Sequence, residues 1–270
     1  MKSRSRLLPI LFTSLAIVSI SSFASDDVGK LVMSTGSGNQ FHADVPFVVP
    51  NYLATQEIGP GGSHTFTDAG HIQQVYSTSE FRGSPILIRA IYWRPSPGYG
   101  LAFHTTLPDI QINLSTTSKQ PDGLSSVFAE NVGLDDRVVF KGPLKLSSRF
   151  RDGPGGSKRF DMMVRLQHPF YYDPAQGNLL VEIRNFQASP AAYTDEYGQD
   201  NDGGSRAVAF DANATTANFT DTGIDPIQII FDPVRTKKAS PADDSKATES
   251  VKNSFKPAPG LVALSPGASR

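Results

Sequence analysis

The stretch from Leu107 to Phe186 constrains the fold of this chain more than any other. It contains several short runs in which apolar and polar residues alternate, separated by turns rich in Gly, Pro and Asp. In the run 109–116, Ile110, Ile112 and Leu114 alternate with polar residues. A period of two is typical of a half-buried antiparallel strand, whose successive side chains point to opposite faces of the sheet. We therefore expect an antiparallel, β-rich core.

Runs before and after this stretch predict further strands. Pro46 indicates that the first run lies at a sheet edge, because proline cannot donate a backbone hydrogen bond. Ile86–Trp93 is apolar on both faces and indicates a central strand, with Ile91 and Trp93 on one face and Ile86 and Ile88 on the other. The clearest expected strands cover 45–49, 86–93, 109–116, 136–142, 143–148, 161–167, 178–186, 206–212 and 227–234.

About ten short strands with turn signals between them are typical of a sandwich or a barrel. We predict an all-β fold, an antiparallel β-sandwich of the jelly-roll kind. One short helix is expected over 124–132, where apolar residues recur at i, i+3, i+4 and i+8 before Gly133.

The N-terminal sequence has the layout of a secretory signal peptide. Three basic residues precede the apolar run Leu7–Ile20, and Ser22-Phe23-Ala24 fits a cleavage site. The run is shorter than the roughly 20 residues of a spanning helix, although an uncleaved anchor is the alternative. We expect a signal peptide at 1–24, a flexible lead-in at 25–44, the β-sandwich domain at 45–234 and no membrane span after cleavage.

The last segment, 235–270, is rich in Ser, Pro, Ala and Lys and poor in apolar residues, which predicts a disordered tail.

Net charge and cysteine content limit the classes of function that are expected. The net charge is −1, which gives no reason to expect a nucleic-acid partner. The chain has no Cys, which excludes disulfides, thiol catalysis and thiolate metal sites. The expected location is secreted, periplasmic or at the cell surface.

Four segments between about Ile72 and Phe186 match a sequence pattern shared by a group of proteins. The C-terminal tail does not match the ending that is common in this group. The segments are IQQVYSTSEF, DIQINLSTTSKQPDGLSSVFAENVG, VVFKGPLKLSS and PFYYDPAQGNLLVEIRNF. In them the chain resembles uncharacterised exported bacterial proteins that often carry a PEP-CTERM sorting signal. The signal itself is not evident, since the tail offers only Pro257-Ala258-Pro259 and the apolar run Leu261–Leu264. The resemblance implies a β-rich protein of the cell surface or extracellular matrix and implies no activity.

Four aromatic residues are candidates for a carbohydrate-binding surface. Trp93 and Tyr99 flank or lie in a loop rich in Pro and Gly, and Tyr171 and Tyr172 precede a turn. Exposed aromatic rings on a β-sandwich can stack on sugar rings. The alternative interpretation is that the four rings pack in the core and the turns.

The loop from Asp195 to Gly204 is a candidate calcium site. It carries Asp195, Glu196, Asp200 and Asp202, and closely spaced oxygen ligands with glycines that allow a sharp turn suit Ca²⁺. The spacing does not match the helix–loop–helix calcium motif. The alternative is a solvated acidic loop without a metal ion.

No catalytic residue is predicted, because the nucleophile motif Gly-x-Ser-x-Gly is absent. The separated glutamates Glu57, Glu80, Glu130 and Glu182 leave open a glycosidase that uses paired carboxylates. For Glu182 we favour a structural ion pair with Arg184, or with Arg165 across the sheet. The sequence thus predicts an exported, non-enzymatic protein that is structural or glycan-binding, with polysaccharides or surface proteins as partners. A secreted carbohydrate-active enzyme is the alternative.

Overall fold

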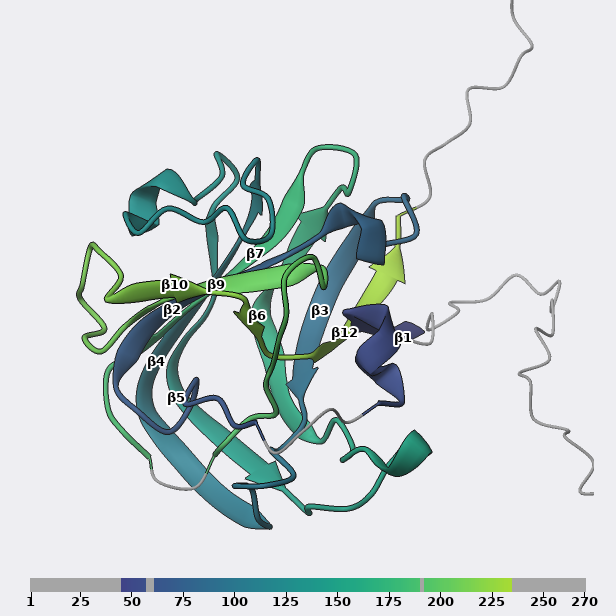
Figure 1. Cartoon of the computed structure of the whole chain (residues 1–270), viewed down its shortest axis with the longest axis vertical. Helices are drawn as coiled ribbons and strands as arrows, with labels where there is room; N and C mark the ends of the chain where they lie inside the picture. The colour runs from purple at the N-terminus through teal and green to yellow at the C-terminus, as the bar shows by residue number, and fades with distance from the viewer. Residues whose placement is uncertain (1–44, 57–60, 190–191, 235–270) are drawn as a thin grey trace, which may run out of the picture. The chain divides into compact units, whose positions relative to one another are not determined.

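The described part of the chain is built from strands, and helix occurs in it only as short 3₁₀ turns. The computed structural model describes residues 45–56, 61–189 and 192–234 (Figure 1). The strands are β1 (Val45–Val49), β2 (Gly70–Tyr76), β3 (Ile86–Trp93), β4 (Phe103–Thr117), β5 (Arg137–Ser148), β6 (Met162–Tyr172), β7 (Asn178–Asn185), β8 (Tyr197–Gly198), β9 (Gly204–Ala209), β10 (Phe219–Asp221), β11 (Gly223–Ile224) and β12 (Ile227–Pro233). The 3₁₀ turns are η1 (Asn51–Ala54), η2 (Thr78–Glu80), η3 (Phe128–Glu130) and η4 (Pro154–Gly156). The predicted signal peptide, lead-in and tail lie outside the described residues.

Two sheets form the sandwich. One has the strand order β1-β12-β3-β6, the other β10-β9-β2-β7-β4-β5, and β8 pairs separately with β11. All neighbours are antiparallel. If β1 to β7 and β12 are counted as strands one to eight, the sheets read 1-8-3-6 and 2-7-4-5. This interleaved order is that of a jelly roll, so the predicted fold class is confirmed.

The sheet positions follow from the sequence. β1 lies at an edge, as Pro46 predicts, and β3 lies between β12 and β6. The two strands expected over 136–148 are one continuous strand, β5, whose backbone accommodates Pro143 because β5 is an edge strand. β4 begins earlier than predicted, and its pairing with β5 shifts between Leu107 and Ile110, where a bulge accommodates Pro108.

A bulge also corrects the predicted faces of β3. Ile230 and Phe231 of β12 lie opposite Ala90 and Ile88, so β3 has one extra residue, Arg89, and the alternation of side chains changes phase there. Ile86, Ile88, Ile91 and Trp93 therefore all join the buried core, whereas strict alternation placed two of them on each face. One inserted residue converts a strand with two apolar faces into a strand with one dominant core face.

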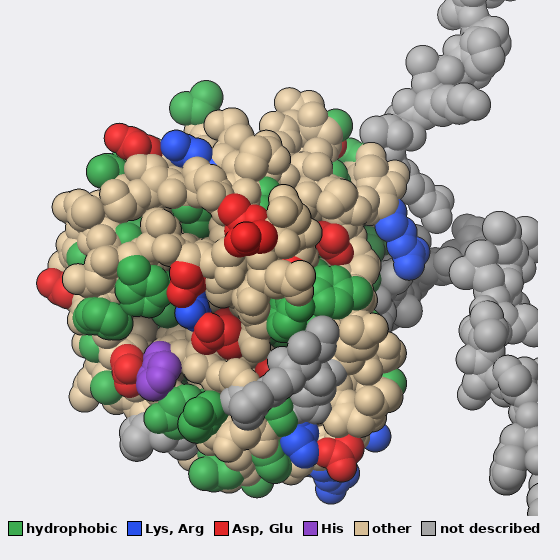
Figure 2. Space-filling view, in the orientation of Figure 1, with side chains coloured by type: hydrophobic (Ala, Val, Ile, Leu, Met, Phe, Trp, Pro, Cys, Tyr) green, Lys and Arg blue, Asp and Glu red, His purple; other side chains and the backbone are tan. Residues whose placement is uncertain are grey.

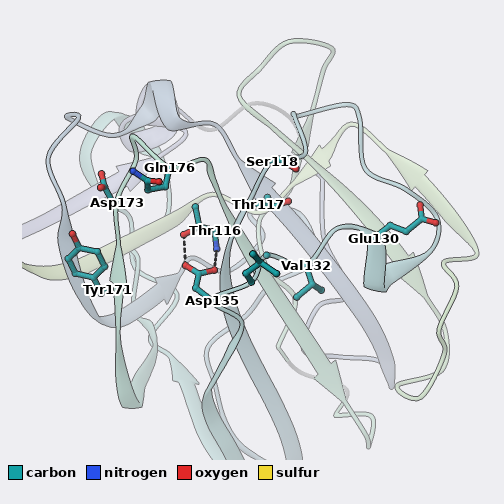
Figure 3. Close-up of a pocket in the computed structure, with 11 residues that line it drawn as sticks. Thr116, Thr117, Ser118, Glu130, Val132, Asp135, Tyr171, Asp173 and Gln176 are labelled. Atoms are coloured by element: carbon teal, nitrogen blue, oxygen red, sulfur yellow. Dashed lines mark hydrogen bonds between the residues drawn. The ribbon is translucent and has the colours of Figure 1, made fainter. Parts of the chain in front are cut away.

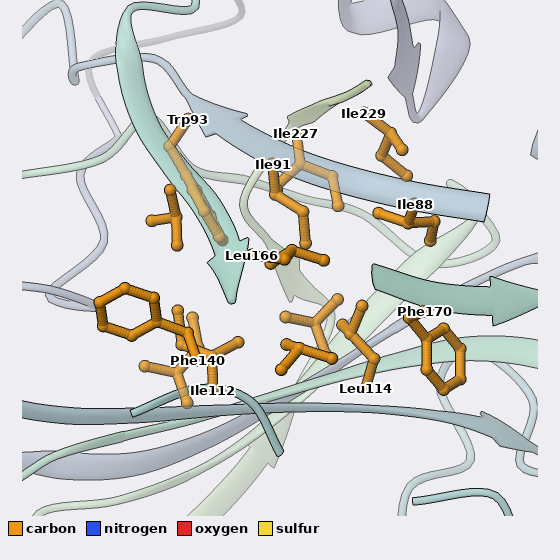
Figure 4. Close-up of a cluster of buried hydrophobic side chains, with 14 of the residues drawn as sticks. Ile88, Ile91, Trp93, Ile112, Leu114, Phe140, Leu166, Phe170, Ile227 and Ile229 are labelled. Carbon is orange, nitrogen blue, oxygen red and sulfur yellow. The ribbon is translucent and has the colours of Figure 1, made fainter. Parts of the chain in front are cut away.

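The core lies between the two sheets. Figure 4 shows Ile88, Ile91, Ile227 and Ile229 of the four-stranded sheet facing side chains of the six-stranded sheet, among them Leu114. Phe66 packs edge-on against Trp93, with ring centroids 5.0 Å apart. A core of this kind supplies the main stabilisation of a chain that has no disulfides.

The expected helix over 124–132 is wrong: only the turn η3 is helical. The backbone there bonds to another segment, because Phe128 N–H donates to Thr215 O (3.1 Å) and Ala217 N–H donates to Ser126 O (2.7 Å). Donors and acceptors used in this bridge are not free for helical hydrogen bonds. No described helix is long and apolar enough to cross a bilayer.

Candidate functional site

An open pocket lies at one end of the sandwich, where β4 ends and β6 turns into β7. It has a volume of about 500 Å³. In Figure 3, Tyr171 and Asp173 lie on one side of the pocket, Glu130 lies on the other, and the linked pair Thr116 and Asp135 lies between them. Thr117, Ser118, Val132, Gly133, Leu134 and Gln176 complete the lining.

The floor of the pocket is held by Asp135. Its Oδ1 accepts from the backbone N–H of Thr116, and its Oδ2 accepts from the Thr116 hydroxyl, both at 2.7 Å. The loop that carries Asp135 passes so close to β4 that a Cβ atom on Gly133 would lie 1.8 Å from Thr116 O. Glycine is required at this crossing, and the two hydrogen bonds fix the loop against the strand end.

The β6–β7 turn positions the aromatic wall. Asp173 Oδ1 accepts from Ala175 N–H at 3.0 Å, and the Gln176 N–H closes the turn onto Asp173 O at 2.9 Å. Tyr172 is buried and donates its hydroxyl to Gly177 O at 2.9 Å, which anchors the turn to the core. The neighbouring Tyr171 points the other way, since successive strand residues face opposite sides, and it is 51% exposed.

This combination of groups suits a polar ligand that also has apolar patches. The Tyr171 ring offers a flat apolar face and a phenolic hydroxyl. The carboxylates of Asp173 and Glu130 accept hydrogen bonds, and the Gln176 amide donates and accepts them. A sugar has both kinds of surface, with C–H faces above and below the ring and hydroxyls around it.

The structure divides the four predicted aromatic residues. Trp93 (1% exposed) and Tyr172 are buried, so neither ring can stack on a sugar, and both leave the candidate set. Tyr171 lines the pocket of Figure 3. Tyr99 is 60% exposed and lines a second pocket of about 580 Å³ with Tyr193, whose ring centroid is 6.1 Å away. The two exposed tyrosines of the predicted set therefore line separate pockets.

Sequence reasoning placed Tyr171 correctly before a turn but missed the rest of its pocket. Asp135 and Thr116 come from segments whose closeness to Tyr171 depends on the strand order, which one sequence does not reveal. The turn residues Asp173 and Gln176 could have been noticed, because they belong to the same Asp-Pro-Ala-Gln-Gly turn.

Three of the four carboxylates of the acidic loop have structural contacts, each with a different partner. Asp195 and Arg94 form a buried ion pair, with Arg94 Nε 2.6 Å from Asp195 Oδ2. Glu196 pairs with Arg206 at 2.7 Å. Asp202 accepts from the backbone N–H groups of Gln199 and Gly204. Asp200 is exposed and lines a different pocket. Across residues 45–56, 61–189 and 192–234, no three His, Asp or Glu side chains gather as metal ligands. Calcium binding stays a prediction of the sequence.

The predicted glutamates also separate in space. Glu80 Oε2 accepts from Asn51, Glu130 accepts from Ser125, and Glu57 lies outside the described residues. Glu182 is buried on β7 and forms the expected ion pair with Arg184 at 2.9 Å. Its alternative partner Arg165 is excluded, because β7 pairs with β2 and β4 while β6 pairs with β3.

Glu182 belongs to a buried polar network on the outer face of the six-stranded sheet. His71 Nε2 lies 3.2 Å from Glu182 Oε1, and Gln73 donates to Glu182 Oε2 at 2.7 Å. Burial alone would raise the pKa of Glu182, but the interactions with His71 and Gln73 outweigh it and hold the pKa below its usual range. Phe128 stacks on the His71 ring and covers the network. A carboxylate so enclosed acts as a structural anion.

Another buried carboxylate, Asp225, lies between β11 and β12. It is fully buried, and its Oδ2 accepts from the hydroxyls of Thr65 (2.7 Å) and Thr194 (2.9 Å). Its Oδ1 has no hydrogen-bond partner among the described residues. Burial raises the pKa of Asp225 to about 6, since the charged form loses its hydration and gains only two neutral donors.

We expect Asp225 to make the stability of the domain depend on pH. Between an unfolded-state pKa of about 3.9 and the folded value of about 6, only the folded state holds the proton. The stabilisation that protonated Asp225 adds to the free energy of unfolding is therefore fully present below pH 4 and falls as the pH rises. By pH 7 about 3 kcal/mol of it is lost. Asp225→Asn keeps the acceptor oxygen and removes the titration.

Urea unfolding of both proteins from pH 4 to pH 7 measures this effect. The free energy of unfolding of the Asp225→Asn variant should improve relative to the parent protein by up to about 3 kcal/mol across this range. A difference between the two that does not change with pH would contradict the assignment.

The candidate site is an open pocket on a jelly roll, with one exposed tyrosine and polar groups around it. Fold class alone does not assign a function, because the jelly roll hosts many. Neither the models of known protein families nor the curated proteins give a match to this chain.

Proposed function

We propose that this protein is an exported, non-enzymatic glycan-binding module of the cell surface or extracellular matrix. The observation that carries the proposal is the pocket around Tyr171, which joins a half-exposed aromatic ring to carboxylates, an amide and hydroxyls. The N-terminal sequence supports export, and the resemblance to exported bacterial β-rich proteins agrees with a surface role.

The geometry favours binding over hydrolysis. Hydrolysis of a glycosidic bond uses two carboxyl groups that flank the scissile bond, one as an acid and one as a base or nucleophile. In the Tyr171 pocket both oxygens of Asp135 accept from Thr116, and Asp173 caps its own turn. These carboxylates are held as parts of the scaffold, where they offer fixed hydrogen-bond acceptors to a bound sugar.

Replacing Tyr171 with Ala should weaken glycan binding about tenfold or more, because the largest apolar contact of the pocket is lost. Affinity electrophoresis against xylan, glucomannan and dextran would first identify an uncharged ligand, and titration calorimetry would then compare the variants. Tyr171→Phe should keep most of the affinity, since the ring face remains.

Tyr99→Ala is the matched control, because it removes another tyrosine that is more than half exposed from the second pocket. Equal losses for Tyr171→Ala and Tyr99→Ala would contradict the assignment of the site. A folded parent protein that none of these polysaccharides retards would contradict the proposed ligand class. Release of reducing sugar ends during incubation would move the protein to the enzyme class.

A further inference from the structure

The charges of the described residues are segregated along the chain. Residues 137–170 carry eight Lys or Arg and two acidic residues, whereas the other described residues carry six Lys or Arg and 17 Asp or Glu. Figure 2 shows the acidic part of the surface: carboxylates lie across the middle of this face, and basic side chains lie mostly near its rim. A net charge near zero thus conceals a strongly basic region on β5, β6 and their connection.

The basic side chains come together because β5 and β6 are neighbouring edges of the two sheets. Lys141 and Lys145 alternate with the buried Leu144 on β5, so both point outward, about 13 Å apart along the strand. On β6, Arg165 lies two residues before Gln167, and both are exposed.

Gln167 joins the two edges. Its Oε1 accepts from Lys141 N–H (3.1 Å) and its Nε2 donates to Lys141 O (2.9 Å), as a neighbouring strand would. Arg165 lies two residues before Gln167 on the same exposed side of β6, so it belongs to the edge that Gln167 joins to Lys141. We call Lys141, Lys145, Arg149 and Arg165 the basic seam.

The side chains of the basic seam are exposed and have no carboxylate partner among the described residues. In contrast, the basic residues elsewhere in the domain include Arg94, Arg184 and Arg206, each held by an Asp or Glu. A row of exposed, unneutralised cations raises the local concentration of anions and attracts a polyanion at low salt.

We propose that the basic seam binds an anionic polysaccharide, one that carries carboxylate or sulfate groups along its length. The charge complementarity is direct, and the edge-to-edge arrangement offers a surface that a linear chain can follow. The N-terminal sequence predicts export, and the anionic polymers outside cells are largely acidic polysaccharides. Within the described residues 137–170 no aromatic side chain is exposed, so unpaired bases find no stacking platform there, which disfavours single-stranded nucleic acid.

This surface is distinct from the Tyr171 pocket, whose lining includes no Lys or Arg. The inference goes beyond the proposed binding of uncharged glycans and stands on its own observation, the charge segregation. Either proposal can therefore fail without the other: Tyr171→Ala tests the pocket, and charge reversal on β5 tests the seam.

The test is binding of the full chain to sodium polygalacturonate, measured by affinity electrophoresis and calorimetry at low and at high salt. Lys141→Glu with Lys145→Glu should weaken binding about tenfold or more, since two favourable charge contacts become repulsive. Binding by the parent protein should also weaken several-fold from about 50 to 300 mM NaCl, because exposed charges are screened.

The matched control is Arg82→Glu with Lys119→Glu, which changes the net charge by the same amount at two basic residues outside the seam. This control should bind polygalacturonate within about twofold of the parent protein. Equal losses in both double variants would overturn the proposal, because only the net charge would then matter. Tighter binding of duplex DNA or of anionic phospholipid vesicles than of polygalacturonate at the same salt would also overturn it. Tyr171→Ala should leave this binding unchanged.

Discussion

Asp195→Ala should lower the free energy of unfolding by about 3–5 kcal/mol. Arg94 is almost fully buried, and its guanidinium donates to Asp195, to Leu53 O and to Gln56 O, the last two at 2.7 Å. Removing the carboxylate leaves a buried cation with only neutral acceptors. The cost of such an uncompensated charge exceeds the net stabilisation that the intact ion pair supplies.

Urea unfolding followed by circular dichroism measures this loss, and Asp200→Ala is the matched control. Asp200 lies in the same acidic loop but is exposed, so its removal should change the stability by less than about 0.5 kcal/mol. Equal effects of the two substitutions would contradict the ion-pair role of Asp195.

The same pair of variants tests the calcium prediction: a rise in melting temperature with Ca²⁺ that Asp200→Ala abolishes would establish a metal site.

Trp93→Ala should cost about 3–5 kcal/mol, because it opens a large cavity between the two sheets. Trp93 is 1% exposed and packs against Phe66. A domain of ordinary stability, about 5–15 kcal/mol, would be left close to its folding limit by this change.

The matched control for Trp93→Ala is Tyr171→Ala, which removes an exposed aromatic ring and should leave the unfolding midpoint nearly unchanged. This comparison also separates the two roles that the sequence left open for aromatic residues. A stable Trp93→Ala variant with impaired glycan binding would reverse the assignment of both residues.

Much of the fold follows from local sequence patterns. The alternation in 109–116 and the apolar run 86–93 identify strands because side-chain orientation repeats every two residues regardless of distant contacts. The bulge after Ile88 could not be foreseen, since it depends on how β3 pairs with β12. The helix predicted over 124–132 failed for a related reason: its backbone bonds to residues 215–217, which lie far away in sequence.

The candidate site was predictable only in part. Tyr171 could be chosen as a candidate because it is aromatic and precedes a turn. Which of Tyr171 and Tyr172 is exposed depends on which face of β6 packs against the core, and the sequence does not show this. The net charge of −1 gave no hint of the basic seam, because a sum over the chain hides where the charges lie. Alternation along β5 would have placed Lys141 and Lys145 on one face, but their closeness to Arg165 required the strand order.

The pairing of β1 with β12 has a consequence for how the protein is made. Val45 lies opposite Phe231, so the first and last described strands are neighbours, and β12 is also the link between β1 and β3. A ribosome must therefore synthesise nearly the whole domain before the four-stranded sheet can close. Contacts between such distant residues also slow folding. If the chain is exported as its first residues predict, this delay would keep it unfolded long enough to be threaded through a narrow translocation channel.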